Sequence, residues 1–314
     1  MARKKTQLEI VSRHGRSAAA RPVPPTVSGR WILVAFGVVI AAAALCAWAS
    51  LCLLFWQGAW QLLYRPTSVV ARTPAAAGLA FEPVSFATQE TGAPRLLGWW
   101  IPAAGASAPR YTILYLHDRV GNLSDCIPKL AEIHAAGVNL LAFDYRGYGQ
   151  SEFVHPSEAH WQQDADWALY YLTATRQVPV SQIVLVGSGL GANLALEVAA
   201  AHPEVAGVVL DAPINAPVDL VFKDARAHLV PAHLLFHDRY RMLKPAAGLR
   251  IPSLWILEAD TTSASEQASE QPLINAFNAI TAPKSLVRPT DSPAPMLNLT
   301  AELARWLSSV NAHR

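Results

Sequence analysis

The chain has 314 residues, 52% of them hydrophobic, and a formal net charge of +2. The charge is uneven, because residues 1–30 hold seven Lys and Arg against one Glu, leaving 18 Lys and Arg and 22 Asp and Glu to the remainder. A slightly acidic body excludes a nucleic-acid-binding footprint, so no nucleic-acid partner is expected. No repeat of 20–50 residues is visible in the sequence.

An apolar run follows the basic tail. Residues 31–56 carry no charge, and at about 1.5 Å per residue they span the roughly 30 Å of a bilayer's hydrocarbon core. A cleaved signal peptide is the alternative, but the run is longer than a usual signal core. We therefore expect an uncleaved transmembrane helix over 31–58, through which the lipid bilayer is a partner. The basic tail, 1–30, should stay cytoplasmic, which places the C-terminal body on the other side, the periplasm if the source is a bacterium.

The body is expected over residues 65–314, a length that suits one domain with a small insertion. Cys126 is its only cysteine, so it has no internal disulfide. Runs of apolar, β-branched or aromatic residues predict strands, and helical patterns lie between most of the later runs. The predicted strands are 83–88, 94–101, 111–117, 138–143, 182–187, 206–211, 252–258 and 284–288.

Strands that alternate with helices predict an α/β fold with a mainly parallel sheet covered on both faces. A helix is predicted over 157–175, where apolar residues recur at helical spacing. The first two predicted strands are separated by a short polar loop, which favours an antiparallel hairpin at the sheet edge. Residues 212–250 contain four prolines and no strand-like run, so they predict a small helical cap or insertion.

The stretch 183–196, IVLVGSGLGANLAL, fits two motifs. As G-x-G-x-x-A (Gly187, Gly189, Ala192), with Asp211 ending the next apolar run, it is a dinucleotide fingerprint. As G-x-S-x-G it is a nucleophile elbow in which Gly189 takes the place of the serine. A dinucleotide fingerprint usually opens its domain, whereas about five strand-like runs precede this one. The order therefore favours the elbow.

Neighbouring segments carry a family resemblance. LYLHDRVGNLSD (114–125) resembles the oxyanion-loop segment L-x-x-H-G-N-x-x-N of the α/β-hydrolase superfamily, and FDYRGYGQSE (143–152) is similar to its F-D-Y-R-G-x-G-x-S segment. Their order, followed by the elbow, resembles membrane-anchored, single-pass α/β-hydrolases with little cap, over roughly residues 60–310. The resemblance implies an α/β-hydrolase sheet and a catalytic Ser, acid and His in that chain order.

The chain departs from this pattern at the nucleophile. Gly189 keeps the strained turn at little conformational cost but supplies no attacking oxygen. Ser188 is one residue early, so its side chain is expected to point elsewhere, and it remains the fallback nucleophile.

The remaining catalytic positions also differ. The oxyanion segment reads His117-Asp118 where the family has His-Gly, and a carboxylate there opposes a developing oxyanion, although the N–H of Leu190 remains a donor. Alternatively, Asp118 turns out to solvent or pairs with Arg119 or Arg146. Asp260 lies near the family's acid position. The loop that should carry the histidine, TDSPAP (290–295), contains none.

No metal or cofactor is expected. His233 and His237 have i, i+4 spacing, but Pro231 interrupts the pattern and no Cys or Glu completes a ligand set, so solvated histidines are predicted.

These departures predict a membrane-anchored α/β-hydrolase-fold protein that is catalytically degenerate. Its pocket is expected to bind a small acyl or lipid-like ligand, or its body to act as a membrane-tethered interaction module. One alternative is an active esterase, thioesterase or lipase-like enzyme that uses Ser188 with His117 as base. The other is a dinucleotide-binding protein in which Asp211 contacts a ribose hydroxyl.

Overall fold

The computed structural model describes residues 28–87, 95–105, 109–257, 264–288 and 299–312. The chain divides into two compact units, residues 1–49 and 50–314. The described part of the first unit is helical and belongs to α1 (Gly29–Gly58), which is long and apolar enough to cross a membrane.

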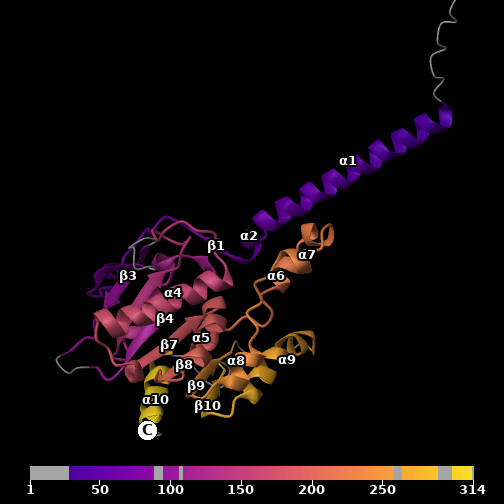
Figure 1. Ribbon diagram of the computed structural model, residues 1–314. Helices are drawn as coiled ribbons and strands as arrows, with labels where there is room; N and C mark the ends of the chain where they lie inside the picture. Colours follow the sequence, from indigo (N-terminus) through magenta and orange to yellow (C-terminus); the bar gives the residue numbers. More distant parts are fainter. Residues whose placement is uncertain (1–27, 88–94, 106–108, 258–263, 289–298, 313–314) are drawn as a thin grey trace, which may run out of the picture. The chain divides into compact units, whose positions relative to one another are not determined.

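The second unit is built on an eight-stranded sheet with the order β10-β9-β8-β7-β4-β6-β3-β2 (Figure 1). All eight strands coincide with the apolar runs of the sequence to within two residues at either end. Its strands are β2 (Glu82–Ala87), β3 (Arg95–Ile101), β4 (Thr112–Leu116), β6 (Asn139–Asp144), β7 (Ile183–Ser188), β8 (Gly207–Asp211), β9 (Ser253–Ile256) and β10 (Lys284–Val287).

The strand directions confirm the predicted sheet. From β6 to β10 every pair is parallel, whereas β2 and β3 form an antiparallel hairpin at the edge and β3 also runs antiparallel to β6. The parallel strands β4, β7, β8, β9 and β10 all end at the same edge of the sheet. In the register of β7 and β8, Ser188 lies opposite Asp211.

Helices cover both faces of the sheet because its central strands are apolar on both sides. Buried side chains of α3 and α10 pack on one face, and those of α4, α5, α8 and α9 pack on the other. The bounds are α3 (Ile127–His134), α4 (Glu158–Tyr170), α5 (Leu190–Ala201), α8 (Leu243–Gly248), α9 (Ala264–Ala279) and α10 (Leu299–Ala312).

The predicted helix over 157–175 is present as α4 with Ser157 as its N-cap, whose hydroxyl accepts the N–H of His160, and it continues into a π turn, η3 (Tyr171–Thr175). Short elements complete the unit. They are α2 (Trp60–Leu63), the parallel pair β1 (Arg65–Pro66) and β5 (Val120–Gly121), and the 3₁₀ turns η1 (Pro74–Ala77), η2 (Leu123–Asp125) and η4 (Val180–Gln182).

Residues 212–250 form no strand and fold into short helices. Before α8 these are α6 (Asp219–Phe222), the 3₁₀ turn η5 (Ala225–His228) and α7 (Ala232–Leu235). Buried apolar side chains hold them to the body, because Val221, Ala227, Val230 and Ala232 belong to the same core cluster as α4 and α5.

The second unit begins at residue 50, before residue 65, where the sequence analysis placed the start of the body. Phe55, Ala59, Leu63 and Tyr64 are buried in the core of the second unit, so the last turn of α1 and all of α2 are parts of the body. The final residues of the apolar run are therefore held by packing within the body.

Candidate functional site

A tight turn joins β7 to α5 at the position of the predicted elbow. Gly189 has φ 57° and ψ −125°, a backbone conformation that side-chain-bearing residues rarely adopt. The outer glycines are required by close approach, because a Cβ at Gly187 collides with the carbonyl of Gly191 and a Cβ at Gly191 collides with that of Leu116. The strand-to-helix turn is thus kept in full, with no side chain at its apex.

Asp118 fills the space above this apex. Its Oδ1 accepts a hydrogen bond of 2.8 Å from the N–H of Leu190, the donor that an oxyanion hole would use. A Cβ built on Gly189 collides with the carboxyl group of Asp118. The carboxylate therefore occupies both the anion-binding N–H at the start of α5 and the volume that a side chain at residue 189 needs.

The alternative orientations of Asp118 are wrong. Arg119 donates to the carbonyl of Leu63 at 2.9 Å, and Arg146 forms a buried ion pair with Asp164 at 2.6 Å. Asp118 instead turns inward, because the N–H groups at a helix N-terminus stabilise a carboxylate.

His117 is fully buried behind this carboxylate. Its Nδ1 is 2.7 Å from the carbonyl of Asp118, which accepts and so assigns the proton to Nδ1. Its Nε2 lies 3.6 Å from Oδ1 of Asp144 and has no hydrogen-bond partner among the described residues. Burial lowers the pKa of His117 to about 4 and raises that of Asp144 to about 7, so His117 is neutral at physiological pH.

The structure does not bring Ser188 and His117 together as nucleophile and base. Ser188 donates to Oδ2 of Asp211 at 3.0 Å, and Lys129 of α3 pairs with the same oxygen at 3.0 Å. The ring of His117 packs instead against Tyr145 on the α4 side of the sheet, 4.4 Å between centroids. The one-residue shift from the apex thus leaves Ser188 in a polar cluster on the α3 side.

Two predicted positions lie outside the described residues. These are Asp260 and the loop 290–295, which follow β9 and β10. Among the described residues, no group of three His, Cys, Asp or Glu is placed to hold a metal ion. The ring of His233 packs against Phe222 at 3.9 Å, and His237 lines a groove.

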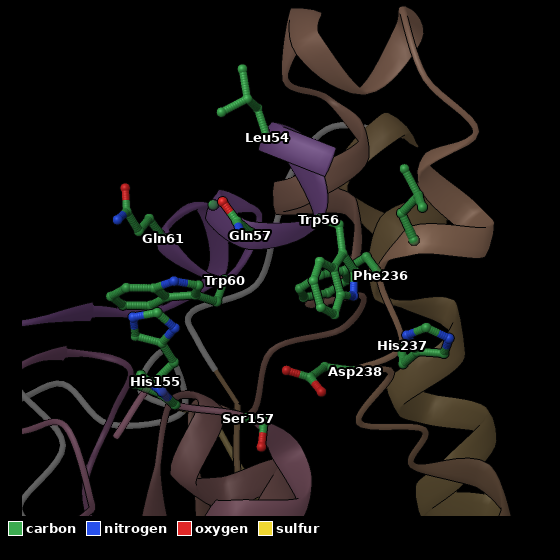
Figure 2. Close-up of a pocket in the computed structure, with 13 residues that line it drawn as sticks. Leu54, Trp56, Gln57, Trp60, Gln61, His155, Ser157, Phe236, His237 and Asp238 are labelled. Atoms are coloured by element: carbon green, nitrogen blue, oxygen red, sulfur yellow. The ribbon is translucent and has the colours of Figure 1, made fainter. Parts of the chain in front are cut away.

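That groove is a second candidate site, which sequence reasoning did not find. It has a volume of about 960 Å³ and lies where the end of α1 and α2 meet the residues before α4 and after α7 (Figure 2). Trp60 stacks on His155 with ring centroids 4.8 Å apart. The groove is lined by Leu54, Trp56, Gln57, Gly58, Trp60, Gln61, His155, Pro156, Ser157, Leu235, Phe236, His237 and Asp238.

The sheet order and the elbow at the end of β7 define an α/β-hydrolase fold. The order differs from the 3-2-1-4-5-6 arrangement of dinucleotide-binding sheets. Asp211, the residue expected to contact a ribose, is bonded to Ser188 and Lys129. The dinucleotide interpretation of Gly187-x-Gly189-x-x-Ala192 is therefore not supported.

Comparisons with known proteins agree with this fold. A family model described as alpha/beta hydrolase fold matches residues 111–263. An uncharacterised protein of Mycobacterium tuberculosis is 28% identical over 221 residues, which cover 69% of this chain and 75% of that protein. The structure of a Pyrococcus furiosus esterase is similar with a TM-score of 0.57 and is 18% identical in sequence. The match covers 78% of this chain and 97% of the esterase chain. The structure of an alpha-beta hydrolase of Vibrio vulnificus is similar with a TM-score of 0.56. It is 19% identical in sequence, and the match covers 76% of this chain and 82% of that chain.

The chain has the α/β-hydrolase fold, as the resemblance seen in the sequence predicted. Similarity to the esterase at this level of identity concerns the fold, and the chemistry has to be argued from the elbow itself.

Proposed function

We propose that this protein is a membrane-anchored member of the α/β-hydrolase superfamily that has lost serine-hydrolase chemistry and acts by binding a ligand or partner. The observation that carries the proposal is the hydrogen bond from the N–H of Leu190 to the carboxylate of Asp118, 2.8 Å long. Acyl transfer requires that this N–H be free to stabilise a developing oxyanion. Here it faces a negative charge supplied by the chain itself.

Two further deficits act in the same direction. Gly189 supplies no oxygen at the apex of the elbow, so no covalent acyl intermediate forms there. The loop 290–295, which should carry the catalytic histidine, contains none. A serine hydroxyl without a base is a poor nucleophile.

The anchoring part of the proposal rests on α1. We infer that it remains uncleaved and spans a bilayer with the basic residues 1–30 in the cytoplasm and the body on the opposite side, following the positive-inside rule. The packing of Phe55 and Leu63 into the body supports an uncleaved helix. Cleavage near the end of the apolar run would disturb this packing and expose apolar side chains of the body to water.

A fluorophosphonate probe tests the loss of chemistry. The full chain in maltoside micelles should remain unlabelled while an active serine hydrolase in the same mixture is labelled. Labelling of the parent that Ser188→Ala abolishes would overturn the proposal and establish a working nucleophile.

The enzymatic alternative has one observation in its favour. Ser188, Asp211 and Lys129 form a connected polar chain, so Ser188 is the residue that an unconventional hydrolase would use. Hydrolysis of p-nitrophenyl butyrate separates the alternatives. We expect equal background rates for the parent, Ser188→Ala and Lys129→Met, whereas a rate that falls in both variants would favour the enzyme.

A further inference from the structure

The groove of about 960 Å³ has two aromatic walls. Figure 2 shows Trp60 and His155 on one side and Trp56 with Phe236 on the other, with Asp238 and Ser157 below them in this view. Trp60 is held in place by its stacking on His155, with 24° between the ring planes. A carboxylate beside aromatic faces is the arrangement that recognises an organic cation, which is attracted both to the negative charge and to the rings.

The carboxylate is fixed by its neighbours. The hydroxyl of Tyr64 donates to Oδ2 of Asp238 at 2.6 Å, and Tyr240 lies 3.0 Å from the same hydroxyl. Arg239 directs its guanidinium to the carbonyls of Asp238 and His233. Burial raises the pKa of Asp238 above its ordinary value, in spite of the hydrogen bond from Tyr64 and the nearby charge of Arg239. A bound cation would favour the ionised form of this carboxyl group.

The position of the groove along the chain indicates where such a cation comes from. Leu54 and Trp56 belong to the same helix as the apolar run and directly follow its most apolar part. About 20 residues suffice to cross the hydrocarbon core, and 23 lie between Arg30 and Leu54. Trp56 and Trp60 therefore fall where interfacial tryptophans are found, at the level of lipid headgroups.

The surface beside the groove is also suited to lipid. Leu229 and Leu234, on the segment that leads into Leu235, are 61% and 74% exposed. Exposed leucines on the segment that leads into the groove favour a bilayer over a soluble ligand as the neighbour.

We propose that this groove binds the ammonium-bearing headgroup of a zwitterionic phospholipid from the adjacent leaflet, with the ammonium beside Asp238 and between Trp56 and Trp60. The inference rests on the membrane-anchoring part of the proposed function and is independent of whether the elbow is inactive. Fluorophosphonate labelling and headgroup binding are separate measurements, so either proposal can fail alone.

Saturation-transfer NMR tests it on the full chain in maltoside micelles, with dodecylphosphocholine as the probe. Its N-methyl protons should receive saturation from the parent. The half-saturating concentration should rise about tenfold in Asp238→Asn and in Trp60→Leu, because each removes an attraction of one to two kcal/mol. The matched control Trp31→Leu, which changes an exposed tryptophan at the other end of α1, should bind as the parent does.

Two competitors identify the ligand's chemistry. Dodecyl phosphate has the same tail without the ammonium and should not displace the probe, and free tetramethylammonium should compete only weakly. Unchanged binding in both variants, or displacement by dodecyl phosphate at equal concentration, would overturn the proposal. Equal competition by tetramethylammonium would assign the site to a free soluble cation and would also overturn it. Circular dichroism melting of Asp238→Asn and Trp60→Leu shows that both remain folded.

Discussion

Gly189→Ser should destabilise the body by a predictable amount. A side chain at φ 57° and ψ −125° costs about 1–3 kcal/mol of backbone strain. The new Cβ also expels the carboxyl group of Asp118. The lost hydrogen bond to Leu190 adds about 1–2 kcal/mol, the lower part of the range for a charged acceptor because Asp118 is only half-buried. The free energy of unfolding should therefore fall by about 2–5 kcal/mol.

A double-mutant cycle isolates the contact. Asp118→Ala alone should cost about 1–2 kcal/mol, but close to nothing in the Gly189→Ser background, where the hydrogen bond is already gone. The coupling should thus be about 1–2 kcal/mol.

Guanidinium unfolding in maltoside micelles, followed by tryptophan fluorescence, measures the four free energies. Gly78→Ser is the control for a positive φ without a collision, since φ is 71° there and no atom lies within 4 Å of the new Cβ. It should cost only about 1 kcal/mol. Strictly additive costs at positions 118 and 189 would refute the reasoning, because they would show that the carboxylate does not occupy the apex.

Three further predictions concern buried charge and topology. Asp144 keeps its proton up to about pH 7 in the folded state but only to about pH 4 when unfolded, so its burial costs stability as the pH rises from 4 to 7. Asp144→Asn should therefore gain stability relative to the parent over that window in denaturation measured at pH 4.5 and 7.5, and a relative loss would contradict the assignment. Arg146→Met leaves Asp164 buried without its partner and should lower the free energy of unfolding by about 3–5 kcal/mol in the same denaturation assay. The control Arg305→Met, at an exposed ion pair, should lower it by less than about 1 kcal/mol. Equal losses in the two variants would count against the buried pair. In intact cells an impermeant maleimide should label Val69→Cys, whose native side chain is 75% exposed, above the background of the parent, whereas labelling only after permeabilisation would reverse the proposed orientation.

The sheet could be predicted from the sequence because its signals are local. Each strand is a short apolar run, and the hairpin of β2 and β3 is marked by a short loop between two such runs. The elbow was recognisable from the spacing of Gly187, Gly189 and Gly191, since close backbone approach leaves no alternative to glycine at the outer positions.

Contacts between distant segments could not be predicted in the same way. The burial of Phe55 and Leu63 in the body depends on residues far along the chain, so an apolar run ending near 58 gave no sign that its last turn is part of the core. The inward turn of Asp118 depends on the N-terminus of α5, 72 residues away in sequence. The groove joins three separate segments, so no local pattern in the sequence indicates it.

The retained elbow and the proposed loss of chemistry have a common physical explanation. Gly187 and Gly191 are demanded by backbone packing against Leu116 and between strand and helix, whatever residue stands at the apex. Only the apex residue and the oxyanion donor take part in the chemistry of an active elbow. Here the apex has no side chain, and the donor is bonded to the carboxylate of Asp118. Absence of a side chain at Gly189 leaves a volume beside an unpaired helix N-terminus, and Asp118 fills the volume and accepts the Leu190 N–H. The pair Gly189 and Asp118 is thus a self-consistent structural solution, in which each residue makes the other tolerable and together they close the site to an oxyanion.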